Sequence, residues 1–521
     1  MRSFPVHIFT ALVFLSCLLS LFKIYSLLAE ADSQDETEAF CEMEYVLSDM
    51  QPSNGNSCGL LYSLDGKQMT ERRFASDDNP VLDSSITRSD GKKFSMPTEE
   101  YYASVVGIDN DYASGLLTSC KRVLKANAAA SNRRNAVGDS LITTIVSSAQ
   151  EEAYAQLQDF NGIARWSSIV VVSNDGAVLV DSASNSKAIM DYDQKLWEYY
   201  VSGSKGIEPQ PSERLYTYQE FGSSVPECVG SSFKPVTARL LALHDECVST
   251  EFSLRNEFFE DVPELTVGSD TIHNHDYTVP GMYPRQVSLA KALAYSSNTY
   301  FLSHVQNFGM QNYMDGLIQQ FRLDQPIWTD AHEIPAMPLS AEDANTNIRN
   351  FLEKVSYGQE ARLTPVRLAS LYNYIISGEW YDPFFIAQVR EPSNQVIFSA
   401  VPVEREEYHF DIDMYNDILI NGLSYTFRQY ADAAPSVFDK YADSLISSGR
   451  ILTKSGTADK VEGESENHTM VLTLLDERRE HVVCTAVIAV DYLDVSLGGN
   501  LVSASAMIDR LLPVLNQLGV L

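Results

Sequence analysis

Residues 230–235 read Gly-Ser-Ser-Phe-Lys-Pro, and this stretch decides how the middle of the chain folds. Pro235 has no backbone N–H to donate to the carbonyl of Ser231, so a helix that continues over 236–243 must begin near that serine. The positive end of the helix dipole then lies at Ser231, and Lys234 follows one turn later on the same face. Because a partly desolvated lysine can take up a hydroxyl proton, the stretch predicts Ser231 as a nucleophile and Lys234 as its base.

A second polar stretch, Ser296-Ser297-Asn298, lies between two segments with helical periodicity. Such a break can point polar side chains into a cleft. We expect Ser296 to relay a proton between Lys234 and a leaving amine. We expect the side-chain amide of Asn298 to bind a peptide group of the substrate.

A third stretch, Lys454-Ser455-Gly456-Thr457, lies on a predicted strand, where Lys454 and Gly456 share one face and the other two residues share the opposite face. Lys454 should keep the site positive and attract a terminal carboxylate. Gly456 should leave room for a substrate backbone that pairs with the strand, and Ser455 should help to bind it. The backbone N–H groups of Ser231 and Thr457 are the candidate oxyanion hole.

Each of the three stretches is a weak signal alone, but together and in this order they resemble the motifs of the penicillin-binding protein and serine β-lactamase superfamily. Other segments are similar to that family as well: Ala294–Phe301, Tyr357-Gly358-Gln359-Glu360 with Leu363-Thr364-Pro365, and Gly138–Ile145 followed by Gln150. The resemblance covers about Tyr101 to Leu521. We expect a class B member of the family, because the sequence before this stretch is too short for a glycosyltransferase domain.

The resemblance implies a serine D,D-transpeptidase that cross-links peptidoglycan. Ser231 would attack the bond between the two terminal D-alanines of a stem peptide, release one of them and pass the acyl group to an amine of a neighbouring stem. β-Lactams would acylate the same serine. The resemblance also implies a polytopic membrane glycosyltransferase as a partner.

Some residues depart from the family pattern. Val229 stands where the family often has proline, with Cys228 close to the nucleophile, and the His-x-Trp-Phe expected after the third motif reads His468-Thr469-Met470-Val471. These changes loosen the subgroup assignment. The catalytic side chains of the pattern are all present.

The N-terminus predicts export from the cytoplasm. Ile8–Phe22 and Ile24–Ala29 are almost wholly apolar, and together they approach the ~20 residues that cross a bilayer. We expect a single-pass membrane anchor with the catalytic domain on the extracytoplasmic side. A cleaved signal peptide is the alternative, because Ala29-Glu30-Ala31 has the small-x-small form of a cleavage site.

The acidic charge of the chain argues against nucleic acid as a partner. The chain has 70 Asp and Glu against 38 Lys and Arg, which would repel nucleic acid.

Outside the anchor, Cys41 with Cys58 and Cys228 with Cys247 would close the shortest disulfide loops, but the sequence leaves both pairings open. No Cys/His spacing of a zinc site is present, so we expect neither a metal nor a cofactor.

The expected fold is of the α+β type. A hairpin around Asp175-Gly176 precedes a helical middle region, and three strands follow from Ile451, so the pattern predicts an antiparallel sheet built from both ends of the domain and covered by helices. The expected organisation is an anchor at 1–30, a small stalk module at 31–150 and a transpeptidase domain at 151–521.

Three alternative functions remain. In a D,D-carboxypeptidase or a β-lactamase, water instead of an amine would resolve the acyl-enzyme. A membrane-anchored scaffold or β-lactam sensor would keep the fold without turnover.

Overall fold

The structure is a computed structural model that describes residues 59–73, 94–107, 115–124, 138–201, 221–267, 270–339, 348–412, 414–461 and 465–521. All of these belong to one compact unit. The expected anchor at 1–30 lies outside the described residues, as do Cys17, Cys41 and Cys58. Among the described helices, none is long and apolar enough to cross a membrane.

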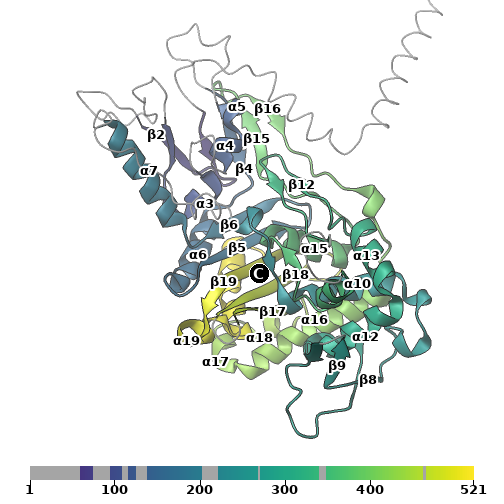
Figure 1. Cartoon of the computed structure of the whole chain (residues 1–521). Coiled ribbons are helices and arrows are strands. Elements are labelled where there is room, and N and C mark those ends of the chain that lie inside the picture. Colours follow the sequence, from purple (N-terminus) through teal and green to yellow (C-terminus); the bar gives the residue numbers. More distant parts are fainter. Residues whose placement is uncertain are drawn as a thin grey trace, which may run out of the picture. The chain divides into compact units, whose positions relative to one another are not determined.

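Five strands form the main sheet, in the order β17, β18, β19, β5, β6, and every neighbouring pair is antiparallel. Their bounds are β5 Trp166–Ser173, β6 Val178–Ala183, β17 Ile451–Val461, β18 Ser465–Leu475 and β19 Val482–Asp494. Figure 1 shows β5, from the first half of the chain, beside the yellow strand β19. The sheet is therefore assembled from both ends of the domain, as expected.

The central strands are rich in β-branched residues because helices cover them on both faces. Val170 of β5 pairs with Val487 of β19, and both side chains are fully buried. A strand that is buried on both faces is apolar along most of its length, which these valine and isoleucine runs reflect.

Helices α6 (Ser147–Leu157) and α20 (Ala504–Gln517) cover one face of the sheet. The residues of α20 that face the core are spaced with the helical period: Met507, Ile508, Leu511, Leu512 and Leu515. This apolar stripe fixes α20 against the sheet.

Helix α15 (Pro365–Ser377) covers the other face, where it packs on β5 and β19, and α10 (Lys234–Leu243) packs against α15. Nearly all of α10 is buried, including Lys234. The preceding 3-10 turn η3 (Gly230–Phe233) contacts β17. The start of α10 is therefore fixed against the edge strand of the sheet.

The middle region contains more strands than its sequence indicates. Its helices are α11 Leu289–Ala294, α12 Asn298–Phe308, α13 Met310–Gln319 and α14 Ile348–Ser356. Short strands precede them: β8 Phe259–Asp261, β9 Glu264–Val267, β10 Asp270–His273 and β11 Arg285–Val287, with β8 paired to β11 and β9 to β10. The mainly helical expectation missed these four strands, which are too short and too charged to show a period-2 pattern.

A second sheet has the order β1, β4, β15, β16. Its strands are β1 Leu61–Tyr62, β4 Ser140–Thr143, β15 Ile386–Arg390 and β16 Val396–Ser399. It thus joins strands from both sides of the boundary that we expected at residue 150, and that division stays a prediction.

The remaining elements are short, apart from helices α7 and α16. They are β2 Thr70–Arg73, β3 Phe94–Pro97, η1 Glu100–Tyr102, α3 Ala103–Val106, α4 Leu116–Ser119, α5 Lys121–Leu124, η2 Gln158–Phe160, α7 Ser186–Val201, α9 Phe221–Ser224, β7 Glu227–Cys228, η4 Asp245–Cys247, η5 Thr250–Phe252, β12 Ile327–Trp328, β13 Glu333–Ile334, β14 Arg362–Leu363, η6 Glu406–Tyr408, α16 Met414–Ala433, α17 Pro435–Phe438, α18 Asp443–Ser447, α19 Val495–Gly498 and η7 Gly499–Val502.

Candidate active site

The nucleophile candidate lies in η3, directly before α10. Ser231 is partly exposed, whereas Ser232, Phe233 and Lys234 are buried. Gly230 has φ +56° and lies against the backbone of Thr457, where a Cβ atom would overlap the strand. The helix thus starts where Pro235 predicted, and a glycine allows the serine to approach β17 closely.

The amine of Lys234 is the centre of the site. Its Nζ lies 2.7 Å from Ser231 Oγ, 3.1 Å from Ser296 Oγ and 2.7 Å from Asn298 Oδ1. It also lies 2.6 Å from the carbonyl oxygen of Ser296. A neutral amine at this position can donate to the carbonyl oxygens of Ser296 and Asn298 and accept from the hydroxyl of Ser231.

Electrostatics favour the neutral amine. Burial lowers the pKa of Lys234 well below its ordinary value, the nearby Lys454 lowers it further, and Asp261 acts in the opposite direction. Burial also lowers the pKa of Lys454, to about 7. A lysine that is fully buried beside another lysine can therefore act as a base at neutral pH.

Ser296 lies between the two lysines. Its Oγ is 3.1 Å from Lys234 Nζ and 3.0 Å from Lys454 Nζ. The residue has φ +56°, a left-handed conformation that costs a non-glycine residue of order 1–3 kcal/mol. This turn between α11 and α12 lets both the carbonyl and the hydroxyl of Ser296 reach Lys234.

Asn298 is held at both ends of its side-chain amide. Its Oδ1 accepts from Lys234, and its Nδ2 donates to the carbonyl of His273 at 2.7 Å. Here the amide orients the lysine. Its expected contact with a substrate peptide group stays a prediction.

The third motif lies on β17, as expected, with Lys454 buried and bonded to Ser296 Oγ and to the carbonyl of Ser455. The surroundings of Gly456 differ from the expectation. A Cβ atom there would overlap the carbonyl of Val229 and lie 2.8 Å from the N of Ser232. The nucleophile turn, and not open space for a substrate, adjoins this glycine.

The opposite face of β17 carries Ser455 and Thr457. Ser455 Oγ lies 2.8 Å from the hydroxyl of Tyr430 on α16, a neighbour that the sequence did not indicate. Thr457 is exposed, and its carbonyl accepts from Gln359 Nε2 at 3.2 Å. Its Oγ1 lies 3.5 Å from Nδ1 of His468, whose pKa burial lowers to about 4.

Two further groups of side chains lie outside the three motifs. Cys228 and Cys247 form no disulfide with each other. Donor atoms of His244, Glu246 and Cys247 lie within 4.8 Å of one another, in a partly exposed turn after α10. The sequence spacing did not indicate this group, and the expectation of no metal stays a prediction.

Part of the chain is similar to a known protein family and to a curated relative. Residues 227–474 match the family model of the penicillin binding protein transpeptidase domain. A protein of Chlorokybus atmophyticus described as a "Peptidoglycan D,D-transpeptidase FtsI homolog" is 26% identical over 206 residues. That match covers 37% of this chain and only 26% of the relative's own length.

Solved structures share the fold over most of this chain. The D,D-transpeptidase domain of a peptidoglycan glycosyltransferase from Eggerthella lenta has a TM-score of 0.62 and 16% identity, and the match covers 89% of this chain and 99% of the other. Penicillin-binding protein A from M. tuberculosis, solved as a ceftriaxone acyl-enzyme complex, has a TM-score of 0.62, 17% identity and coverages of 89% and 98%. The region that matches the family model, residues 227–474, contains all three motifs, and the structure assembles them in one site.

Proposed function

We propose that this chain is a peptidoglycan D,D-transpeptidase that works through an acyl-enzyme on Ser231. The observation that carries the proposal is the amine of Lys234, which is fully buried, lies 2.7 Å from Ser231 Oγ and has its pKa lowered by burial and by Lys454. A base in this state can deprotonate a serine at neutral pH, which is the requirement for nucleophilic acyl transfer.

In the acylation step, Ser231 Oγ attacks the carbonyl carbon between the two terminal D-alanines while its proton passes to Lys234. The oxyanion accepts from the backbone N–H groups of Ser231 and Thr457. The C–N bond then breaks, and the amine of the released D-alanine takes the proton from Lys234 through the hydroxyl of Ser296. Lys454 stabilises negative charge on this path and attracts the terminal carboxylate, which Ser455 helps to bind.

In the second step, an amine of another stem peptide attacks the acyl carbon. Its proton returns along the same path to Lys234, and Ser231 leaves with a proton as a hydroxyl. β-Lactams would acylate Ser231 in the same way, because their strained amide presents the same kind of carbonyl. We also propose a single-pass anchor before this domain, an extracytoplasmic location and a polytopic membrane glycosyltransferase as a partner.

The experiment supplies a pentapeptide that ends in D-alanyl-D-alanine, with and without an acceptor amine, and separates the products by mass spectrometry. A cross-linked product that requires the acceptor and is lost in Ser231→Ala supports the proposal. Hydrolysed peptide alone would indicate a carboxypeptidase, and rapid hydrolysis of a β-lactam would indicate a β-lactamase. A folded protein that yields none of these products would indicate a membrane-anchored scaffold or β-lactam sensor.

A further inference from the structure

A buried carboxylate lies behind the second motif. The side chain of Asp261, on β8, is fully buried. Its Oδ1 accepts from Thr299 Oγ1 at 2.7 Å and from Ser297 Oγ at 2.9 Å. These two residues flank Asn298, so one carboxylate holds both neighbours of a residue that contacts the base.

Asn274 extends this network to the backbone of the motif. Its Oδ1 accepts from the N–H of Asn298 at 2.6 Å and from that of Thr299 at 3.2 Å, while its Nδ2 lies 3.4 Å from Asp261 Oδ2. Ser297 Oγ also accepts from the N–H of Tyr300 and so caps α12. The start of α12 is thus held by side chains from the segment between β8 and β11.

The charge of Asp261 is balanced by Arg285, which faces it across the β8–β11 pair. Arg285 Nε lies 3.1 Å from Asp261 Oδ2, and the guanidinium also forms an ion pair with Asp276. The same guanidinium lies 4.6 Å from the ring centroid of Tyr295, the residue directly before Ser296. The ion pair of Asp261 and Arg285 therefore contacts residues on both sides of Ser296.

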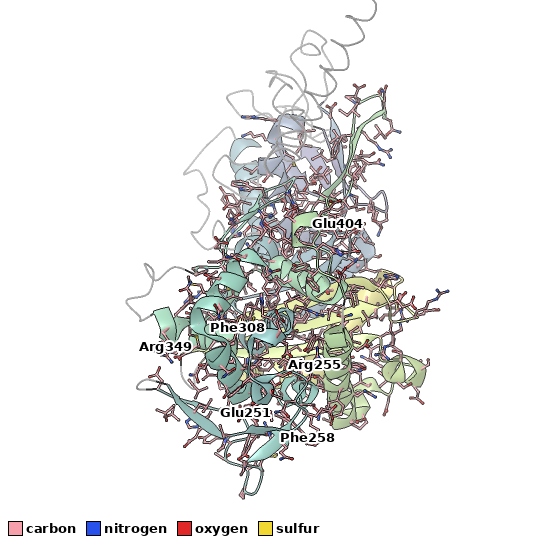
Figure 2. The ribbon with its side chains drawn as sticks, turned by 90° about the vertical axis from the view of Figure 1, so that its right-hand side faces the viewer. Glu251, Arg255, Phe258, Phe308, Arg349 and Glu404 are labelled. Atoms are coloured by element: carbon pink, nitrogen blue, oxygen red, sulfur yellow. The ribbon has the colours of Figure 1, made fainter. Side chains whose placement is uncertain are left out.

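The segment that carries Asp261 is itself anchored to the rest of the domain. Asp245 accepts from Ser253 Oγ and from the N–H of Leu254, each at 2.7 Å. Arg255, labelled in Figure 2, donates from Nε to the hydroxyl of Tyr415 on α16 at 2.8 Å. These contacts therefore hold the backbone that leads into β8 and Asp261.

We propose that Asp261 is a positioning residue for the acylation centre: its carboxylate fixes the second motif through Ser297 and Thr299, and its charge offsets part of the positive charge around Lys234. The inference rests on the proposed function and adds a residue outside the three motifs. Asp261 does not touch the reacting atoms, and it acts through the residues that do.

The charge of Asp261 changes the pKa of Lys234 in a defined direction. The groups that act on Lys234 are the cation of Lys454 on β17, which lowers its pKa, and Asp261 on β8, which raises it. Asp261 itself faces Arg285 on β11 and the phenol of Tyr300 on α12. Removing the charge of Asp261 therefore lowers the pKa of Lys234, so that the base becomes available at lower pH.

The test measures the rate of Ser231 acylation by a fluorescent penicillin from acid to alkaline pH, in the full chain and in Asp261→Asn. Asparagine keeps the volume and one acceptor oxygen, and Arg285 keeps its pair with Asp276. We expect a plateau rate about tenfold lower, because one charged acceptor has been weakened. We also expect the acid limb of the profile to move to lower pH.

Ser297→Ala is the matched control, because it breaks the same network and the helix cap but keeps the charge of Asp261. It should lower the plateau and leave the acid limb in place. If Asp261→Asn does not fold, Arg285→Gln provides the opposite test, because it leaves the charge of Asp261 unbalanced and should move the limb to higher pH.

An acid limb that does not move in the charge variants, or moves by the same amount in Ser297→Ala, would overturn the inference. The proposed function would still hold in that case, provided that the unaltered chain is acylated on Ser231. A chain that is not acylated at any pH would refute the proposed function and the inference with it.

Discussion

Lys454→Met should slow the acylation of Ser231 and move its pH dependence in a direction that the structure defines. Methionine keeps an unbranched apolar side chain that matches the buried lysine up to Cε, and it removes the cation. The variant loses one contact to Ser296 Oγ at 3.0 Å and one to the carbonyl of Ser455 at 2.8 Å. Of these, the contact to Ser296 lies on the proposed proton path.

A hydrogen bond to a charged group contributes about 1.5–3 kcal/mol, so the loss of this contact in the transition state should slow acylation by about 10- to 150-fold. Since Lys454 lowers the pKa of Lys234, its removal raises that pKa. Less of Lys234 is then neutral at a given pH, and the acid limb of the rate profile should move to higher pH.

The assay is stopped-flow acylation by a fluorescent penicillin over a pH series, with thermal unfolding of each variant to establish that the fold is intact. Lys440→Met, an exposed lysine on the described surface, is the control for the loss of a positive charge and should leave both rate and limb unchanged. A folded Lys454→Met with an unshifted limb, or one shifted to lower pH, would refute the electrostatic coupling between the two lysines.

Three further substitutions separate positioning from packing. Asn298→Ala should slow acylation by about 10-fold or more in stopped-flow assays, with little change in melting temperature, because it frees the base lysine from one of its partners. Gly456→Ala should lower both the melting temperature and the acylation rate, because a Cβ atom would overlap the carbonyl of Val229; a variant as stable and active as the unaltered chain would contradict this packing. Tyr430→Phe removes the hydroxyl beside Ser455 and should raise KM for the peptide more than it lowers kcat; an unchanged KM would show that this contact does not orient the motif.

The sequence could predict those parts of the site that local rules determine. Pro235 limits where α10 can start, so the position of Ser231 relative to Lys234 follows from the helix geometry alone. The strand that carries Lys454 was also predicted, as the first of the three strands that follow from Ile451. The early hairpin and the late strands predicted a sheet built from both ends of the domain, but they did not predict the order of its strands.

The contacts that position these residues could not be predicted in the same way. Asp261 meets Ser297 across 36 residues of chain, through strands too short to show a pattern. The role of Gly456 depends on the close approach of the nucleophile turn, and Tyr430 reaches Ser455 from a different helix. Such contacts depend on the tertiary packing, and the local periodicity of the sequence does not reveal them.

The most direct test of the central claim is the mass of the protein after exposure to a penicillin, followed by peptide mapping. We predict one covalent adduct per chain, located on Ser231, that is absent from Ser231→Ala and forms much more slowly in Lys234→Ala. An adduct on any other residue, or a folded chain that gains no mass while a known penicillin-binding protein in the same assay does, would contradict the account.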